Sequence, residues 1–126
     1  MKTFKQFILE SQNINDELLH MRTRWKQMGV DVYIHPRETE LNLSSIKVDK
    51  DKRGQGLGTK VMKEILDFAQ KHNLRVTLTP SKDLGATSVT RLIKFYRGFG
   101  FVPNKGRHKD FTVSDTMIWT PKGINN

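Results

Sequence analysis

The sequence predicts a single α/β domain, of the α+β kind, with a mixed central sheet, and three observations support this prediction. The chain of 126 residues is long enough for one domain with a modest core. Segments with the two-residue period of strands alternate with segments that have the spacing of amphipathic helices. The order strand, strand, helix, strand, helix, strand, strand contains one or two helical crossovers, which is too few for a doubly wound fold.

The first 28 residues are expected to form two separate helical pieces. Residues 2–10 place three apolar residues at helical spacing: Phe4, Phe7 and Ile8. Asn13 or Asn15 can cap a second helix that runs to about Met28 and ends at Gly29. The apolar face of that helix is expected to contain Leu18, Met21 or Arg22, and Trp25.

The rest of the chain divides into strands and helices. The expected strands are residues 30–35, 40–48, 75–79, 101–102 and 111–120. The expected helices are residues 59–72 and a segment from a cap at Thr87 or Ser88 to about Arg97. Helix 59–72 carries the apolar stripe Val61, Met62, Ile65, Leu66 and Ala69, and the pair Asp67–Lys71 is spaced for an ionic contact. Residues 36–39 form a turn, residues 81–86 and 103–109 form loops, and residues 121–126 form a loose tail.

The strand 40–48 changes parity in its middle. Leu41 and Leu43 share one face of an ideal strand, whereas Ile46 and Val48 fall on the other. Two explanations remain open, a β-bulge near Ser44–Ser45 or a strand that is buried on both faces.

Charge and composition narrow the possible partners. The net charge is +9, and because residues 1–20 carry a net charge of −1, the remaining residues carry +10. A basic surface favours nucleotides, nucleic acid or acidic proteins. The chain has no cysteine, which excludes disulfides and a cysteine nucleophile, and its four histidines lack paired ligand spacing, so no metal site is expected. No apolar run approaches the roughly 20 residues that span a bilayer, so no membrane partner is expected.

The stretch from Ile46 to Thr59 is a strand end followed by a glycine-rich turn that opens a helix. Gly54, Gly56 and Gly58 remove side chains where a helix N-terminus presents unpaired amides, which suits a phosphate. A Walker A loop does not fit, because its lysine would come one place late. A dinucleotide fingerprint fits poorly, because the third glycine comes one residue early and residues 70–79 contain no acidic ribose ligand.

Two blocks together resemble a known family. The turn reads Arg53-Gly54-Gln55-Gly56-Leu57-Gly58, and a later segment reads Phe95-Tyr96-Arg97-Gly98-Phe99-Gly100-Phe101. The first resembles the coenzyme A pyrophosphate loop of the GNAT N-acetyltransferases, and the second resembles that family's F-Y-x-x-x-G-F segment. The resemblance covers roughly residues 30–117. Two departures are an abbreviated N-terminal region and Val89, which stands where the family often has an asparagine.

The resemblance implies an N-acetyltransferase of compact GNAT fold that uses acetyl-CoA and acetylates a primary amine of a small molecule or a protein. It implies that the backbone of Ile46, Lys47 and Val48 binds the acetyl and pantetheine groups, and that the amides of seven residues cradle the pyrophosphate: Arg53, Gly54, Gln55, Gly56, Leu57, Gly58 and Thr59. It also assigns Tyr96 as the general acid that protonates the departing thiolate.

The general base is not set by the resemblance. Glu40 is the first candidate because it opens the strand that leads to the site, and Glu38 and Asp110 are its rivals. His108 lies in the basic segment 105–109, which either borders the acceptor cleft or is a solvated hairpin.

The N-terminus carries a second resemblance. Residues 1–11 are similar to the capsid-targeting peptide of internal head proteins in large tailed bacteriophages, and Ile8-Leu9-Glu10 followed by Ser11 fits the cleavage pattern of the prohead protease. The alternative is an amphipathic segment that packs on the domain. This resemblance divides the chain into a processed segment, 1–10, and an acetyltransferase domain, 12–126.

A rival function follows from the same resemblance. It is a phage-encoded binding protein that acts on DNA or a host factor through its basic surface. The expected location is the cytoplasm, which is that of the host if the protein is phage-encoded, or the virion head. The oligomeric state, monomer or dimer, stays open.

Overall fold

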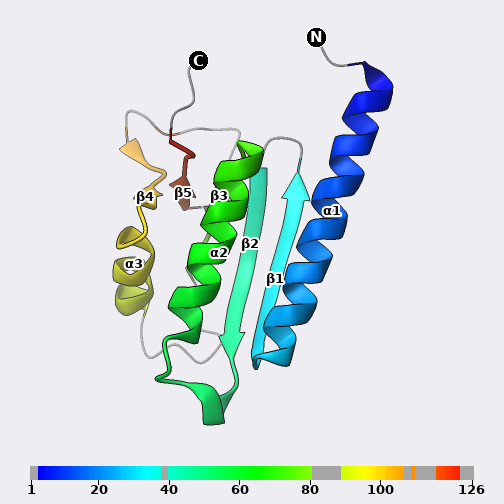
Figure 1. Cartoon of the computed structure of the whole chain (residues 1–126). Helices are drawn as coiled ribbons and strands as arrows, with labels where there is room; N and C mark the ends of the chain where they lie inside the picture. The colour runs from blue at the N-terminus through cyan, green and yellow to red at the C-terminus, as the bar shows by residue number, and fades with distance from the viewer. Residues whose placement is uncertain (1–2, 38–39, 81–88, 107–108, 110–115, 123–126) are drawn as a thin grey trace.

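The computed structural model describes residues 3–37, 40–80, 89–106, 109 and 116–122. Five strands form one mixed sheet in the order β1-β2-β3-β5-β4. The helices α1 and α2 lie side by side on one face of this sheet, and α3 lies next to β4 (Figure 1). The elements are α1 (Phe4–Gln27), β1 (Val30–Arg37), β2 (Glu40–Val48), a short 3₁₀ helix (Lys50–Lys52), α2 (Leu57–His72), β3 (Arg75–Leu78), α3 (Val89–Arg97), β4 (Val102–Pro103) and β5 (Met117–Trp119). The predicted α/β domain with a mixed sheet is confirmed.

Helix α1 is continuous, so the prediction of two separate N-terminal pieces is wrong. Asn13 and Asn15 lie inside the helix, because extending a formed helix through an asparagine costs only a fraction of a kcal/mol, roughly 0.7 or less. The apolar face predicted for the second piece is confirmed, since Leu18 and Trp25 are buried. The helix ends before Gly29, whose φ of 94° reverses the chain into β1.

Strand β1 is two residues longer than predicted. Its residues Val30, Val32 and Ile34 are buried, as the alternation indicates. Pro36 pairs with Leu41, and Arg37 pairs with Glu40, so the predicted turn at 36–39 is wrong for its first two residues. A proline is compatible with this position because β1 is an edge strand.

Helix α2 covers the centre of the sheet with an apolar stripe that consists of Val61, Met62, Ile65, Phe68 and Ala69. Phe68 was not part of the predicted stripe, and the predicted Leu66 is only half-buried. The helix ends at Asn73, which adopts the left-handed conformation with φ of 60°. Leu74 then donates its amide to Ala69 at 2.8 Å and starts the chain toward β3.

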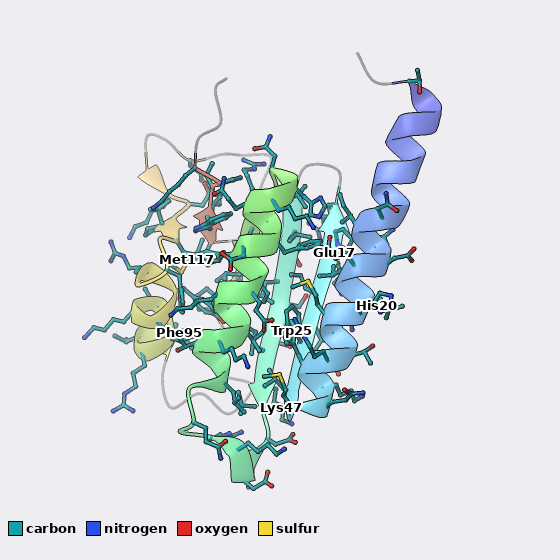
Figure 2. All side chains as sticks on the ribbon, viewed as in Figure 1. Glu17, His20, Trp25, Lys47, Phe95 and Met117 are labelled. Atoms are coloured by element: carbon teal, nitrogen blue, oxygen red, sulfur yellow. The ribbon has the colours of Figure 1, made fainter. Side chains whose placement is uncertain are left out.

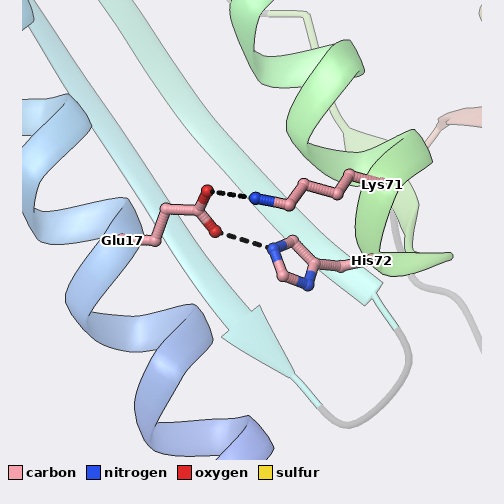
Figure 3. Close-up of polar contacts among 3 residues, drawn as sticks. All are labelled: Glu17, Lys71 and His72. Atoms are coloured by element: carbon pink, nitrogen blue, oxygen red, sulfur yellow. Dashed lines mark hydrogen bonds and ion pairs between the residues drawn. The ribbon is translucent and has the colours of Figure 1, made fainter.

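Polar contacts fasten α1 to α2. Glu17 accepts a hydrogen bond from Lys71 Nζ at 2.9 Å and lies 2.7 Å from His72 Nε2 (Figure 3). Near the other end of the helix pair, Glu64 pairs with Arg24 and accepts the indole hydrogen of Trp25 at 2.9 Å. Lys71 therefore reaches across to α1, and the predicted pairing of Lys71 with Asp67 on its own helix is replaced by this longer-range contact.

The hydrogen bond to Lys71 lowers the pKa of Glu17 below its usual value, with a further contribution from His72, and partial burial opposes this shift. The carboxylate is therefore favoured in its charged form where the two helices meet.

The second half of the chain completes the sheet. Strand β3 runs parallel to β2, and β5 runs antiparallel to both β3 and β4. Asn42 of β2 donates its side-chain amide to Thr77 of β3 at 3.2 Å, and both side chains are buried. Strand β4 begins one residue later than predicted, and β5 is described only over Met117–Trp119. The predicted caps Thr87 and Ser88 and most of the predicted strand 111–120 lie outside the described residues.

Candidate active site

A β-bulge divides β2 into two halves. Tyr33 of β1 pairs with Ser45, and Ile34 pairs with Leu43, so Ser44 is the extra residue on β2. The bulge predicted from the change of parity is therefore confirmed. The other explanation holds for the first half of the strand, which contains three consecutive buried residues: Leu41, Asn42 and Leu43.

Beyond the bulge, β1 is the one described strand that still pairs with β2. The pairing with β3 ends at Leu43 and Leu78, whereas the pairing with β1 continues to Val48. Within the described part of the chain, the β3-side edge of residues 46–48 therefore has no strand to bond. Backbone N–H and C=O groups on such an edge are available to a ligand.

The glycine-rich turn connects this free edge to α2. Gly54 and Gly56 have φ values of 83° and 75°, a conformation that other L-residues rarely adopt. A Cβ at either position would meet no atom within 4 Å, so their outer surfaces are open. Gly58 lies in the first turn of α2, which begins at Leu57, two residues before the predicted start at Thr59.

The N-terminus of α2 presents unpaired amides. Gly56 is the N-cap residue, and it has no side chain to bond the first amides. Lys60 donates its amide to the Gly56 carbonyl at 3.0 Å, which closes the first helical turn. The amides of Leu57, Gly58 and Thr59 come before this bond in the helix and form no helical hydrogen bond to a carbonyl of a preceding turn. Together with the helix dipole, they favour a bound anion.

A cavity of about 220 Å³ lies at this junction. It is lined by the end of β2, the turn, the start of α2 and one residue of α3, namely Val48, Lys52, Arg53, Gly54, Gly56, Leu57, Gly58, Thr59 and Phe95. The Arg53 guanidinium donates its Nε hydrogen to the Val48 carbonyl at 3.1 Å and ties the turn to the strand. The positive charges of Lys52 and Arg53 add to the amide donors, so the cavity suits a phosphate-bearing ligand.

Most of the residues predicted to bind the coenzyme lie around this cavity. Ile46, Lys47 and Gln55 are the predicted residues that do not line it. Lys52 and Phe95 line it but were not predicted as site residues. The sequence did contain a signal for Phe95, because the aromatic segment 95–101 begins with this residue. Figure 2 places Phe95 between α3 and α2, and its ring would lie 4.0 Å from a side-chain Cβ at position 58.

Tyr96 lies in the core behind Phe95. It is only 8% exposed, and its ring meets the edges of Phe95 and Phe101, with centroids 5.4 Å and 5.6 Å apart. Consecutive helical residues point about 100° apart, which explains why Phe95 reaches the cavity wall and Tyr96 does not.

The Tyr96 hydroxyl has no hydrogen-bond partner in the described part of the chain. Every fully buried polar side-chain atom in that part has a partner, so the Tyr96 hydroxyl is not fully buried. The hydroxyl therefore opens onto solvent-accessible space. Burial raises the pKa of Tyr96 above its usual value of 10.0, so the phenol is neutral at neutral pH and can donate a proton.

Glu40 lies at the far end of β2 from the cavity. Glu40 and Val48 are the first and last residues of the strand, which at about 3.3 Å per residue places them roughly 25 Å apart. The carboxylate of Glu40 lies 3.9 Å from the Arg75 guanidinium. The structure therefore does not bring Glu40 to the cavity. The rivals Glu38 and Asp110, like His108, lie outside the described residues.

The described residues form neither a metal site nor a membrane-spanning helix. No three His, Asp or Glu side chains of the described ranges gather to hold a metal ion. His72 contacts Glu17, and His20 and His35 are exposed. None of the helices, over the residues described, is long and apolar enough to cross a membrane.

The bulged strand, its free edge and the amide-rich cavity together form a site suited to a phosphate-bearing ligand. A family model described as an acetyltransferase (GNAT) domain matches residues 18–103, a range that contains the bulge, the glycine turn and Tyr96. The chain belongs to the GNAT acetyltransferase family. It is accordingly an acetyltransferase with acetyl-CoA as its cosubstrate, and the cavity supplies the amides and cations that fit the pyrophosphate of this molecule.

Solved structures share this fold. The anti-CRISPR protein AcrVA5 is 22% identical, with a TM-score of 0.59, over 74% of this chain and 92% of its own. Ard1 from Thermoplasma volcanium is 24% identical, with a TM-score of 0.46, over 73% of this chain. Arabidopsis thaliana Naa50 in complex with the bisubstrate analogue CoA-Ac-MVNAL is 19% identical, with a TM-score of 0.45, over 71% of this chain. The matches cover 61% and 59% of those two chains. A search of curated proteins finds no match.

Proposed function

We propose that this chain transfers an acetyl group directly from acetyl-CoA to a primary amine of a small molecule or a protein, with both substrates bound at once. The observation that carries this proposal is the free edge of Ile46–Val48 beside the cavity at the start of α2. In this scheme the strand edge bonds the amides of the pantetheine arm and the acetyl oxygen. The amides of residues 53–59 bond the pyrophosphate.

The proposed reaction needs one attack and one proton donation. The amine nitrogen attacks the thioester carbonyl carbon, the new C–N bond forms, and the C–S bond breaks. The departing thiolate takes a proton from the Tyr96 hydroxyl. Burial keeps this hydroxyl neutral, and no described residue forms a hydrogen bond with it. The phenolate is reprotonated from solvent, and no covalent enzyme intermediate forms.

The amine must also lose a proton. Glu40 is proposed as the acceptor of this proton, and its distance from the cavity means that the transfer passes through water. The Glu40 carboxylate, which lies 3.9 Å from the Arg75 guanidinium, is the group proposed to receive the proton from this water chain. Direct contact between Glu40 and the acceptor amine is not part of the proposal.

Two measurements test this function. Isothermal titration should detect acetyl-CoA binding that the Gly56→Ala variant weakens, and release of free coenzyme A thiol should depend on an added amine. A panel of polyamines, amino sugars and lysine-containing peptides identifies the acceptor class. Acetyl-CoA binding without thiol release for any amine would contradict the transfer, and absence of binding would contradict the site itself.

A second candidate function rests on the N-terminus. Helix α1 extends past the end of the sheet, and its first turns stand clear of β1 (Figure 1). Glu10 and Ser11 lie within this helix. We propose that Ile8-Leu9-Glu10 is a prohead protease site and that residues 12–126 are packaged in a phage head, after synthesis in the host cytoplasm. There the basic surface would bind DNA or a host factor.

This second candidate has its own test. Incubation with a prohead protease should cut the chain after Glu10, and Glu10→Gln should prevent the cut. Retention on DNA should fall steeply as salt increases, because each neutralised phosphate releases counterions. An uncut chain that also passes freely through a DNA column would contradict the candidate, whatever the outcome of the acetylation assay.

A further inference from the structure

Strand β1 is an outer strand of the sheet, and among the described residues it pairs only with β2. Alternate residues of its eight therefore point their backbone N–H and C=O groups away from β2, to a side that no described strand occupies. Edges of this length are templates on which a further strand can form.

A groove runs along this edge. A cavity of about 320 Å³ lies between α1 and β1, and it is lined by Leu19, Arg22, Thr23 and Lys26 of α1 and by Asp31, Val32 and Tyr33 of β1. The four α1 residues have spacings of three and four, so they form one stripe along the helix, roughly 10 Å long. Three or four residues of an extended chain cover this length at about 3.3 Å each.

The groove combines exposed apolar surface with cations that are not neutralised. Leu19 is 60% exposed and Tyr33 is 47% exposed, which places them among the few large apolar residues that are exposed in the described part of the chain. By contrast, Lys71 of α2 pairs with Glu17, and Arg24 of α1 pairs with Glu64. Arg22 and Lys26 form no ion pair within the described part of the chain, and only Asp31 contributes a negative charge to the lining.

We infer that this groove binds an extended acidic peptide segment of a partner protein, which adds to the sheet as a strand beside β1. Backbone hydrogen bonds to the free edge supply affinity, and alternate side chains supply specificity. Carboxylates on the helix side of the peptide face Arg22 and Lys26, and apolar residues cover Leu19 and Tyr33. A neutral or basic residue belongs beside Asp31.

A second copy of the chain is a poorer occupant. Each copy carries a net charge of +9, and pairing of two β1 edges around a twofold axis would bring both sets of Arg22 and Lys26 to one seam. The groove also shares no lining residue with the cavity at the start of α2. Peptide binding is therefore independent of the acetyl transfer proposed above.

A fluorescein-labelled heptapeptide that alternates valine and glutamate tests the inference by fluorescence anisotropy on the full chain. Three versions separate charge from strand pairing: the glutamate peptide, the same peptide with lysine in place of glutamate, and the glutamate peptide N-methylated on the alternate amides of one edge. The glutamate peptide should bind at least about tenfold more tightly than either of the others. It should also slow amide hydrogen exchange in residues 30–37.

Matched variants place the binding on the groove. Arg22→Glu with Lys26→Glu should weaken the glutamate peptide by about tenfold or more, whereas Lys63→Glu with Lys94→Glu, an equal charge change on exposed residues elsewhere, should weaken it less than about threefold. Melting temperatures of both double variants show that the fold is intact. Any of four results would overturn the inference. These are equal binding of the three peptides, equal effects of the two double variants, unchanged amide exchange in β1, and a dimer in sedimentation that forms through β1.

Discussion

The Nε hydrogen of Arg53 bonds the carbonyl oxygen of Val48 at 3.1 Å, and this bond joins the two backbone segments that line the cavity proposed to bind the coenzyme. Val48 ends the free edge of β2, and Arg53 begins the glycine-rich turn. The same guanidinium lines the cavity, so its remaining donors are near the place where the pyrophosphate is expected. One side chain therefore fixes the geometry of the site and contributes to its charge.

Replacement of Arg53 by lysine separates these two contributions. Lysine keeps the charge but lacks the rigid fork that can bond Val48 and a phosphate together. Arg53→Lys should raise the Kd for acetyl-CoA by about five- to tenfold, with turnover at saturation changed less than about twofold. Isothermal titration and steady-state kinetics measure the two effects. Arg37→Lys, on the exposed end of β1, is the control, and wild-type affinity in Arg53→Lys would show that charge alone is sufficient.

The glycines of the turn give a paired prediction. An alanine at position 56 must adopt the φ of 75° that Gly56 has, which should cost roughly 1–2 kcal/mol of stability. An alanine at position 58 lies in the first turn of α2 and should keep or raise stability, by about 0.5–1 kcal/mol. Both variants should weaken acetyl-CoA binding because a methyl group enters the cavity wall. Urea denaturation and titration calorimetry distinguish them, and unaltered binding in both would place the coenzyme elsewhere.

Loss of the Tyr96 hydroxyl should lower turnover without loss of coenzyme affinity. The hydroxyl bonds no described residue, so Tyr96→Phe should leave the free energy of unfolding unchanged within about 0.5 kcal/mol. Removal of a general acid typically costs about 10²-fold or more in rate. Phe101→Leu, which perturbs the same aromatic cluster, is the control for packing. Full turnover in Tyr96→Phe would remove the assignment of this residue as the acid.

The pH dependence of turnover follows from the same burial. Because the pKa of Tyr96 is raised above 10.0, the hydroxyl keeps its proton throughout the neutral and mildly alkaline range. The raised pKa also stabilises the folded state fully below pH 10, and this contribution is lost as the pH rises through the folded-state value. Turnover should therefore show no decline that depends on Tyr96 below about pH 10. A decline of turnover near pH 8 that Tyr96→Phe abolishes would mean that Tyr96 loses its proton well below pH 10, and would contradict the raised pKa.

The sequence was sufficient for features that local periodicity controls. The change of parity between Leu43 and Ile46 predicted either a bulge or a strand buried on both faces, because a regular half-buried strand has a side-chain period of two. The structure shows the bulge at Ser44 and burial of both faces before it. The spacing of glycines located the turn and the start of α2 within two residues. The cavity followed from these features, since it is formed mainly by neighbours in the sequence.

Features set by distant residues were not predictable in this way. The spacing on α2 favoured Asp67 as the partner of Lys71, but the folded chain brings Glu17 of α1 to it. The position of Glu40 relative to the site likewise depends on which end of β2 bears the cavity. The capping preference of Asn13 was a local signal too, and the cooperativity of the continuous helix outweighed it.

The contact between Glu17, Lys71 and His72 predicts an acid-sensitive link between α1 and α2. The pKa of Glu17 is lowered, so its contribution to stability is present above its unfolded-state value of 4.5 and is lost as the pH falls through the folded-state value. Glu17→Gln should lower the free energy of unfolding by less than about 1 kcal/mol at pH 7, because the carboxylate is partly exposed. The difference from the wild type should shrink as the pH falls below 4.5 and vanish once the carboxylate is protonated in the folded state as well. Denaturation over this pH range measures it, and a difference that persists in acid would assign the effect to packing.

Glu40 provides the sharpest test of how the amine loses its proton. If its carboxylate accepts the proton through water, Glu40→Gln should lower turnover by about three- to tenfold at pH 7, less than the loss expected for a base in direct contact. The loss should shrink as the pH approaches the amine's own pKa, about 10.4 for a lysine side chain, because the acceptor then deprotonates without help. The ion pair with Arg75 offers the matched control, since Arg75→Gln breaks the same contact but keeps the carboxylate. A proton-accepting role predicts a pH-dependent loss in Glu40→Gln alone. An equal and pH-independent loss in both variants would mean that the ion pair only holds β2 beside β3, and the proton would then leave through solvent.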